Sequence, residues 1–185
     1  MSPSLPTWME ARTQDLGTQL RDPRHRCHVA GFLMLSAALL LPGAYLADRF
    51  HLGIDPQLVR CLPEMRAVLI DRATHPTQIG QLVVFEAQGL APAFADGTLL
   101  VKRLAALPGD HIDVSAEGVR VNGTKVTQGL DLARELGHRP QDFIGSYIMP
   151  PGTFLALGTD RRSLDGRYYG PLPASLQRGA ATILF

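Results

Sequence analysis

The feature that most constrains this chain is an uncharged apolar run from Val29 to Ala47, which reads VAGFLMLSAALLLPGAYLA. A membrane crossing by a helix needs roughly 20 apolar residues, and the run is just long enough. A buried helix of a soluble protein is disfavoured, because no polar face is visible. We therefore expect a transmembrane anchor over residues 29–47.

The charges around this run predict its orientation. The positive side chains before it are Arg21, Arg24 and Arg26, with His25 and His28 beside them. Only Arg49 follows closely, and it is next to Asp48. The positive-inside rule places residues 1–28 in the cytoplasm as a tail and residues 48–185 outside it, on the periplasmic side of an inner membrane.

A cleaved secretory signal is the competing interpretation of the same run. Its unbroken apolar core from Gly31 to Leu41 has the length of a signal peptide core. Cleavage after Ala47 would place Tyr45 three residues before the cut, where a small residue is required. We favour an uncleaved anchor, and both interpretations place the rest of the chain outside the cytoplasm.

Composition restricts the remaining function classes. The 185 residues carry a net charge of +1 with 19% charged residues, which fits one domain plus an appendage. This balance gives no basis for a nucleic-acid partner. Cys27 and Cys61 do not make a disulfide framework, and no Cys/His cluster has zinc-site spacing. We expect neither a metal nor another cofactor.

Beyond the anchor, short apolar runs between turn signals predict a mainly β domain with a barrel-like or coiled sheet. The expected strands cover residues 66–72, 81–86, 98–106, 111–114, 118–121, 125–126, 153–157 and 180–185. The one modest helical pattern runs from Leu130 to Leu136, with Gly137 as its C-cap. Residues 48–60 are expected to be a connector.

One of these expected strands contains a lysine that could act in catalysis. Lys102 lies inside the apolar run 98–106, which is followed by the turn signal Pro108-Gly109-Asp110. A core-facing lysine loses hydration, which disfavours its charged form, and a neutral lysine can act as a general base. The alternative is that Lys102 and Arg103 form an ordinary basic pair on an exposed strand.

Three stretches together resemble the type I signal peptidase (S26) family. Lys102-Arg103, Leu107 to Asp110 and Val119 to Gly123 are similar to its lysine box. Gly80 to Phe85 resembles the family's Gly-Asp-x-Val-x-Phe strand, with Gln81 in place of aspartate. Gly158 to Gly170 resembles its C-terminal box, with Gly166 in place of a serine. The resemblance covers roughly residues 60–170 and implies a signal-peptidase-like β domain.

The resemblance also implies roles for individual residues. Lys102 matches the general base of a Ser–Lys dyad, and Ser163 matches the serine that hydrogen-bonds this lysine. Asp165 and Arg167 match a pair that braces the site, and Asp160 is a further supporting residue. The alternative is a solvated loop with an incidental Asp–Arg pair, whose contribution to stability would be about 0–1 kcal/mol.

The chain departs from the family at the nucleophile. Cys61, followed by Leu62-Pro63, stands where the shorter conjugative-transfer (TraF-type) members have Ser-Leu-Pro. The compact spacing from Cys61 to Lys102, the single anchor and the short chain favour this TraF-type branch. A thiolate is a competent nucleophile, and the pKa of a free cysteine is about 8.5, far below that of a serine hydroxyl. Lys102 would therefore need less basicity than in a Ser–Lys dyad.

Two observations support a chain that keeps the fold but does not cut. The alternative interpretation of Cys61 is an inert buried cysteine, the commonest fate of this residue type. Val59 stands where many family members have a hydroxyl that helps to bind the oxyanion, and it has no hydrogen to donate. One lost oxyanion donor costs roughly 2.7–4 kcal/mol in a serine protease.

Two other dyads are alternatives to Cys61–Lys102. A Cys–His dyad would use His75 or His111, both beyond the anchor, but no pattern places either beside Cys61. A LexA-like self-cleaving protease shares a Ser–Lys dyad, but the anchor and the Gly158 to Gly170 loop argue against it.

The resulting hypothesis is a membrane-anchored endopeptidase that acts through an acyl-enzyme on Cys61. The resemblance implies a membrane-embedded precursor as substrate, either a pilin-like protein or another secretion or conjugation protein, with small residues before the cut. Water would give hydrolysis, and another amine would give cyclisation. The alternative is an inactive membrane-anchored binding module of a conjugation apparatus. The lipid bilayer is the second expected partner.

Overall fold

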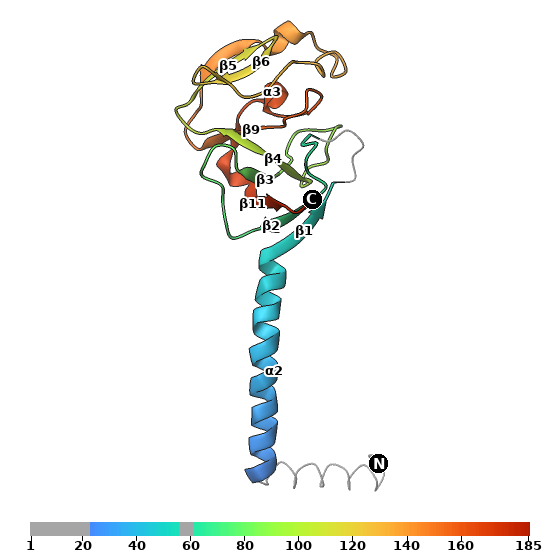
Figure 1. Ribbon diagram of the computed structural model, residues 1–185, viewed down its shortest axis with the longest axis vertical. Coiled ribbons are helices and arrows are strands. Elements are labelled where there is room, and N and C mark those ends of the chain that lie inside the picture. The colour runs from blue at the N-terminus through green and yellow to red at the C-terminus, as the bar shows by residue number, and fades with distance from the viewer. Residues whose placement is uncertain (1–22, 56–60) are drawn as a thin grey trace, which may run out of the picture. The chain divides into compact units, whose positions relative to one another are not determined.

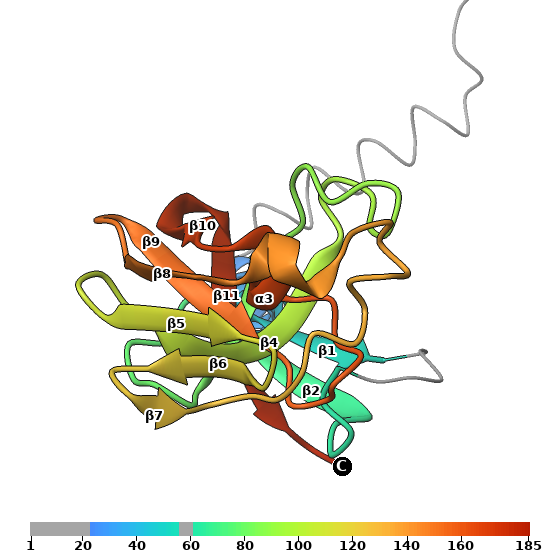
Figure 2. The ribbon, with the colours of Figure 1, turned by 90° about the horizontal axis from the view of Figure 1, so that it is seen from above.

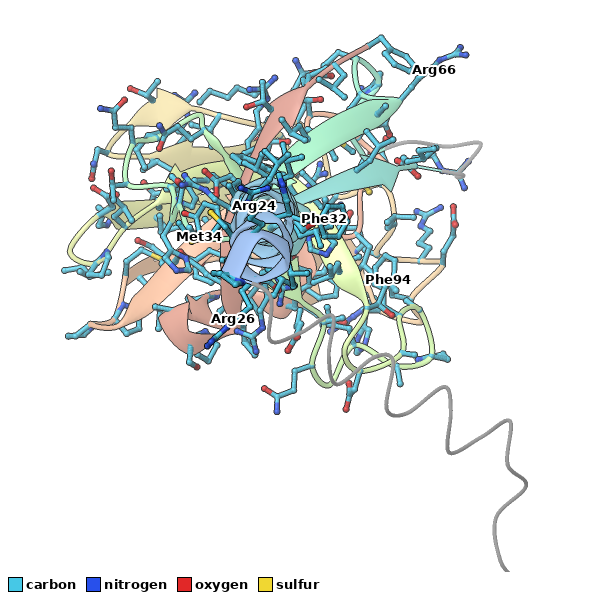
Figure 3. The ribbon with its side chains drawn as sticks, turned by 90° about the horizontal axis from the view of Figure 1, so that it is seen from below. Arg24, Arg26, Phe32, Met34, Arg66 and Phe94 are labelled. Carbon is cyan, nitrogen blue, oxygen red and sulfur yellow. The ribbon has the colours of Figure 1, made fainter. Side chains whose placement is uncertain are left out.

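The computed structural model describes residues 23–55 and 61–185 and divides after Asp48 into two units. In the first unit, α2 (Pro23–Arg49) is a continuous helix that extends beyond the expected 29–47 at both ends (Figure 1). Its segment Arg26–Arg49 is long and apolar enough to cross a membrane, judged by length and composition. Phe32 and Met34 lie on opposite sides of the helix in Figure 3, so its apolar side chains are not confined to one face.

The second unit, Arg49–Phe185, consists mainly of short strands. The strands are β1 (Phe50–Ile54), β2 (Ala67–Asp71), β3 (Leu82–Glu86), β4 (Leu99–Ala106), β5 (His111–Ser115), β6 (Gly118–Val121), β7 (Thr124–Lys125), β8 (Gly145–Ile148), β9 (Thr153–Leu157), β10 (Leu172–Pro173) and β11 (Gln177–Ile183). The short helices are η1 (Pro140–Phe143), α3 (Gly166–Tyr169) and η2 (Ala174–Leu176).

These strands form two antiparallel sheets. The first has the order β1-β2-β11-β3-β4-β9-β10, so the last strand of the chain is inserted between β2 and β3. The second has the order β7-β6-β5-β8, and Figure 2 shows β5, β6 and β7 side by side. The prediction of a mainly β domain with one apolar N-terminal helix is therefore confirmed.

The alternation of side chains along β4 positions the candidate site. Successive residues of a strand point to opposite faces of the sheet. Leu100 and Leu104 pack into the core cluster of Phe85 and Phe154, whereas Val101 packs on the other face. Lys102 is in step with Leu100 and Leu104, so it belongs to the same face of β4.

The expected connector 48–60 was wrong for its first part, because β1 (Phe50–Ile54) pairs along its whole length with β2. Its local signal is weak, since Gly53 interrupts the strand pattern. An added Cβ on Gly53 would lie 2.9 Å from a side-chain carbon of Val68, so the glycine allows the two strands to approach closely.

The helical pattern from Leu130 to Leu136 also has a different outcome. Leu130 and Ala133 are buried, as the pattern predicted, but residues 131–137 form successive turns instead of an α-helix. The Ala133 N–H donates to the Leu130 carbonyl at 3.2 Å. This bond spans three residues, as in a turn, and not four, as in an α-helix. A segment this short gains too few helical hydrogen bonds to offset the cost of nucleation.

Candidate active site

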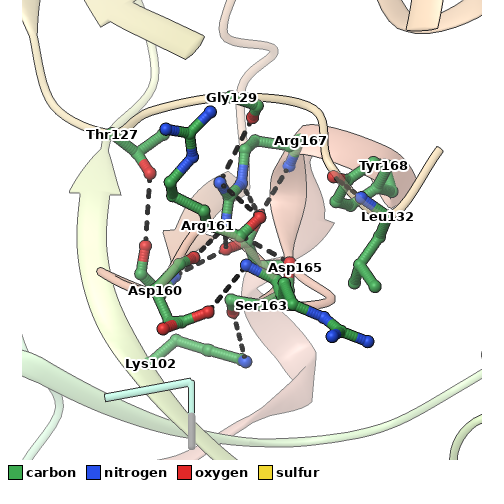
Figure 4. A network of polar contacts seen from close by, with 12 residues as sticks. Lys102, Thr127, Gly129, Leu132, Asp160, Arg161, Ser163, Asp165, Arg167 and Tyr168 are labelled. Atoms are coloured by element: carbon green, nitrogen blue, oxygen red, sulfur yellow. Dashed lines mark hydrogen bonds and ion pairs between the residues drawn. The ribbon is translucent and has the colours of Figure 1, made fainter. Parts of the chain in front are cut away.

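Lys102 is a buried cation-forming side chain in the middle of β4. It is paired with Val83 of β3, and only 1% of its surface is exposed. Its Nζ donates a hydrogen bond to Ser163 Oγ at 2.9 Å (Figure 4). Within residues 23–55 and 61–185, Lys102 forms no ion pair. The alternative of an exposed basic pair is therefore wrong for Lys102, although Arg103 is partly exposed.

The loop from Gly158 to Gly170 is organised around a buried ion pair. The Asp165 carboxylate accepts hydrogen bonds from Arg167 Nε at 2.8 Å and Arg167 Nη2 at 2.7 Å, and both side chains are fully buried. It also accepts from the N–H of Gly158 at 2.8 Å. The alternative of an incidental surface pair is wrong. Removing one partner of such a buried pair typically costs about 3–5 kcal/mol.

Arg167 uses its remaining donors to fix the backbone around the lysine. Its guanidinium donates to the carbonyls of Gln128 at 2.6 Å, Asp160 at 2.7 Å and Ser163 at 3.2 Å. Burial lowers the pKa of Arg167. The hydrogen bonds to Asp165 and the charge of this carboxylate raise the pKa, and with smaller contributions from nearby charges they outweigh burial, so that the net shift is upward. A permanently charged Arg167 thus holds the Ser163 loop in one shape.

Cys61 is attached to the same loop through its backbone. Its carbonyl accepts hydrogen bonds from the N–H groups of Thr159 at 3.0 Å and Asp160 at 3.2 Å. A Cβ on Gly158 would collide with Ser163 Oγ and lie 2.7 Å from the Cys61 carbonyl oxygen. Only glycine at position 158 therefore allows the Cys61 turn and Ser163 to come this close. The Cys61 thiol is free and partly buried.

Sequence reasoning missed Glu64, which joins three parts of the site. Its Oε1 accepts a hydrogen bond from Arg103 Nη2 at 2.7 Å, and its carboxylate is also hydrogen-bonded to Thr159. The turn that carries Cys61, the strand that carries Lys102 and the Gly158 loop are linked in this way. A glutamate three residues after a cysteine carries no local signal for such a contact.

The two histidines are placed differently from the Cys–His alternative. His111 Nε2 is 3.0 Å from Ser146 Oγ, and His111 Nδ1 is 3.2 Å from Asp113 Oδ2. Both of its ring nitrogens are therefore engaged by residues other than Cys61. His75 is exposed, and no hydrogen bond joins it to Cys61 in the described part of the chain. Val59, the residue with the missing oxyanion donor, lies outside the described residues.

The site thus contains a buried amine, a hydroxyl that accepts its hydrogen bond, a braced loop and a cysteine whose backbone carbonyl is hydrogen-bonded to that loop. The family model described as signal peptidase, peptidase S26 matches residues 35–185, and the chain belongs to this family. Membership supports a peptidase hydrolase and confirms the family predicted from the sequence.

Individual relatives agree with this assignment. The chain is 31% identical over 107 residues to a probable signal peptidase I-2 of Synechocystis sp., a match that covers 57% of this chain and 47% of that protein. It is 26% identical over 130 residues to the conjugal transfer protein TraF of Agrobacterium fabrum, covering 63% of this chain and 73% of that protein. The chain thus spans about half the length of the Synechocystis protein.

A solved signal peptidase I from Enterococcus faecalis V583 is a structural neighbour. It has 22% sequence identity and a TM-score of 0.39, and the match covers 59% of this chain and 99% of the neighbour.

Proposed function

We propose that this chain is a membrane-anchored endopeptidase of the signal-peptidase type that uses a Cys61–Lys102 dyad. The observation that carries the proposal is the hydrogen bond from the buried Lys102 Nζ to Ser163 Oγ, on the loop to which the Cys61 carbonyl is attached. In this assignment Ser163 orients the amine, and Asp165 and Arg167 brace the loop. Asp160 supports it through both its backbone contacts to Cys61 and Arg167.

In the proposed reaction Lys102 takes the proton of the Cys61 thiol, and the thiolate attacks the scissile carbonyl carbon. The Cys61 backbone N–H is the proposed donor to the resulting oxyanion. Collapse breaks the C–N bond, and Lys102 returns its proton to the leaving amine. Water, deprotonated by Lys102, then attacks the thioester and releases Cys61. An amine in place of water would yield a new amide, which is the route to cyclisation.

The proposed topology follows from α2 and its flanking charges. Residues 1–28 form the cytoplasmic tail, residues 29–47 the anchor in the inner membrane, and residues 48–185 the extracytoplasmic peptidase domain. Support comes from the length and composition of Arg26–Arg49 and from the arginines before it. Such an anchor would hold the dyad near the bilayer surface.

The proposed substrate is a membrane-embedded precursor protein of the pilin type or another conjugation or secretion protein. The support is the likeness to a conjugal transfer protein and to a signal peptidase. A precursor with its own apolar segment would present its cleavage site at the bilayer surface, where the anchor keeps the enzyme.

An inactive binding module of a conjugation apparatus is the second candidate. Two sequence observations favour it, namely cysteine at position 61 and valine at position 59. Such a protein would hold the same precursor without forming the acyl-enzyme.

The test is an incubation of the full chain in detergent, under reducing conditions, with a precursor pilin. The variants are Cys61→Ala, Cys61→Ser and Lys102→Ala, with His75→Ala and His111→Ala as controls for the Cys–His alternative. We expect wild type and both histidine variants to cut, and Cys61→Ala and Lys102→Ala to be inactive. If wild type is silent and only Cys61→Ser cuts, the binding module replaces the peptidase.

A further inference from the structure

A closed ring of contacts joins Lys102 to the turn that carries Cys61. On one side of the ring, Lys102 Nζ donates a hydrogen bond to Ser163 Oγ. The Ser163 N–H donates to the Asp160 carbonyl at 3.2 Å, and the Asp160 N–H donates to the Cys61 carbonyl at 3.2 Å. This side of the ring belongs to the braced loop. The other side runs from Cys61 along the turn and returns to β4 through an ion pair.

The returning ion pair is formed by Glu64 and Arg103. Arg103 Nη2 donates to Glu64 Oε1 at 2.7 Å, and Arg103 Nη1 donates to the Gly80 carbonyl at 3.1 Å. Arg103 directly follows Lys102 on β4, and its backbone is paired with β3 on one side and with β9 on the other. The arginine is therefore a fixed point, to which the Glu64 carboxylate ties the turn.

The faces of β4 explain how the turn reaches this arginine. Successive residues of a strand point to opposite faces, so Arg103 shares a face with Val101. Val101 packs against the apolar cluster that contains Leu62 and Met65 of the turn, both of which are buried. Glu64 lies between these two residues in the chain and binds Arg103 on the same face. Apolar contacts thus attach the turn to the sheet, and the ion pair adds a directional contact beside Lys102.

We propose that Glu64 is a positioning residue, whose ion pair with Arg103 holds the Cys61 turn at the distance from Lys102 that proton transfer requires. The proposal rests on the proposed Cys61–Lys102 dyad. Glu64 acts through the turn and needs no contact with the substrate. A misplacement of 1 Å can reduce a rate by about 10²-fold. A weak surface contact can therefore matter for the chemistry while it contributes little to the stability of the fold.

The test measures the thiol itself and needs no substrate. Full-length protein carrying Cys27→Ser, which leaves Cys61 as the single cysteine, is alkylated with iodoacetamide over a pH series. The thiolate is the reacting form, and the Lys102 ammonium favours it, so the midpoint of alkylation reports how close the two groups are. Glu64→Ala should raise this midpoint by about one pH unit, at the lower end of the shift that an adjacent opposite charge produces.

The sign of the shift separates positioning from a direct effect of charge. A carboxylate near a thiol disfavours the thiolate, so removal of the Glu64 charge by itself would lower the midpoint. Burial raises the pKa of Glu64, but hydrogen bonds from its own N–H and from Arg103, together with the charge of Arg103, give a net downward shift. Glu64 therefore stays charged while the thiol titrates. A lower or unchanged midpoint in Glu64→Ala would overturn the proposal.

Other charged groups on the surrounding elements are the same in the parent and in Glu64→Ala. They are Lys102 and Arg103 on β4, and Asp160, Asp165 and Arg167 on the loop and α3.

The matched control is Glu86→Ala. The Glu86–Arg178 pair has the same length of 2.7 Å as the Glu64 pair, and the side chains of both pairs are between 34% and 40% exposed. It joins β3 to β11, so its loss should leave the alkylation midpoint of Cys61 unchanged. Both variants should keep the thermal unfolding midpoint within about 4 °C of the parent, because exposed pairs contribute little to stability.

Two results of this control experiment would overturn the proposal. One is an equal shift of the alkylation midpoint in Glu86→Ala, which would show that loss of any such pair has this effect. The other is a much larger fall of the unfolding midpoint in Glu64→Ala than in Glu86→Ala, which would give Glu64 a general structural role.

A double variant distinguishes this proposal from the proposed function. Lys102→Ala should raise the alkylation midpoint of Cys61, because it removes the nearby ammonium. Glu64→Ala should add nothing in this background, since no distance to Lys102 is left to be set, and a full additional shift would overturn the role of Glu64. If Lys102→Ala moves the midpoint and Glu64→Ala does not, only the role of Glu64 fails. If neither moves it, the Cys–Lys dyad fails too.

Discussion

Two polar clusters in the unit 49–185 differ in how they are held. One has the residue types of a common catalytic triad, and the other is the candidate site around Lys102. Ser146, His111 and Asp113 have the residue types of a hydrolase triad. The distance from Ser146 Oγ to His111 Nε2 is 3.0 Å, and that from His111 Nδ1 to Asp113 Oδ2 is 3.2 Å. Lys102, Ser163 and the Asp165–Arg167 pair form the other cluster. Residue types alone would favour the first.

Burial separates the two clusters. The His111 side chain is 50% exposed, whereas Lys102 is 1% exposed and the Asp165 and Arg167 side chains are fully buried. Asp113 and Ser146 are simply opposite each other on β5 and β8. Water screens such an exposed set, so its contacts are weak, while buried charges interact strongly and hold one geometry. The two clusters are therefore distinguished by desolvation and bracing, and not by the types of side chain alone.

The largest expected difference between the clusters is in cleavage. Cys61→Ala or Lys102→Ala should reduce the rate of precursor cleavage by at least about 10³-fold, since they remove the nucleophile or the base. Ser146→Ala should leave the rate within about twofold of wild type, because exposed contacts contribute little. A gel assay with precursor measures both. Equal losses in the two clusters would contradict the comparison.

The free energy of unfolding should depend strongly on the buried carboxylate of Asp165 and weakly on the exposed carboxylate of Asp113. Asp165→Asn leaves the Arg167 guanidinium buried without its counterion and should lower the free energy of unfolding by about 3–5 kcal/mol. Asp113→Asn should lower it by about 0–1 kcal/mol, because its partner is exposed. Denaturant titrations of the full chain in one detergent give the two values, and similar losses would show that burial is not the cause.

Close approach can be tested with two glycines. Gly158→Ala places a methyl group against Ser163 Oγ and the Cys61 carbonyl, and should lower the cleavage rate by about 10²-fold through misplacement of the reacting groups. Gly145→Ala, beside Ser146, has open space around it and should leave the rate unchanged. Cleavage assays at matched protein concentration decide, and a neutral Gly158→Ala would refute the proposed convergence.

The smallest expected effect concerns an ion pair of intermediate exposure. Hydrogen bonds from Arg49 hold the pKa of Asp71 well below its usual range, although burial opposes this shift. Its stabilisation is therefore present above the unfolded pKa of about 3.9 and is lost as the pH falls below it. The difference in unfolding midpoint between wild type and Asp71→Asn should shrink from pH 7 to pH 3. A difference independent of pH would contradict this account.

Much of the framework could be predicted from local signals. The strand Thr153–Leu157 and the hairpin strand Gly118–Val121 have their predicted bounds. Each is a short, mainly apolar run between turn signals, and most of its residues are buried. The family was predicted from three short stretches, and the family model confirms it. Lys102 could be singled out because a lysine inside an apolar strand is unusual.

Other features could not be predicted from neighbouring residues in the sequence. The pairing of β1 with β2, the burial of Asp165 with Arg167, and the contact of Glu64 with Arg103 all join residues whose neighbours arrive from elsewhere in the chain. An exposed and a buried Asp–Arg pair look alike in sequence. The catalytic roles of Cys61, Lys102, Ser163, Asp160, Asp165 and Arg167 remain predictions to be tested.

The sequence by itself determined that the chain has one apolar helix, many short strands and a lysine in a strand, because these depend on local periodicity and composition. Only the tertiary structure decided which polar residues lose their water. Desolvation depends on how distant segments pack, as Gly158 shows by bringing Ser163 against the turn of Cys61. That packing separates the braced lysine site from the exposed Ser146–His111–Asp113 cluster.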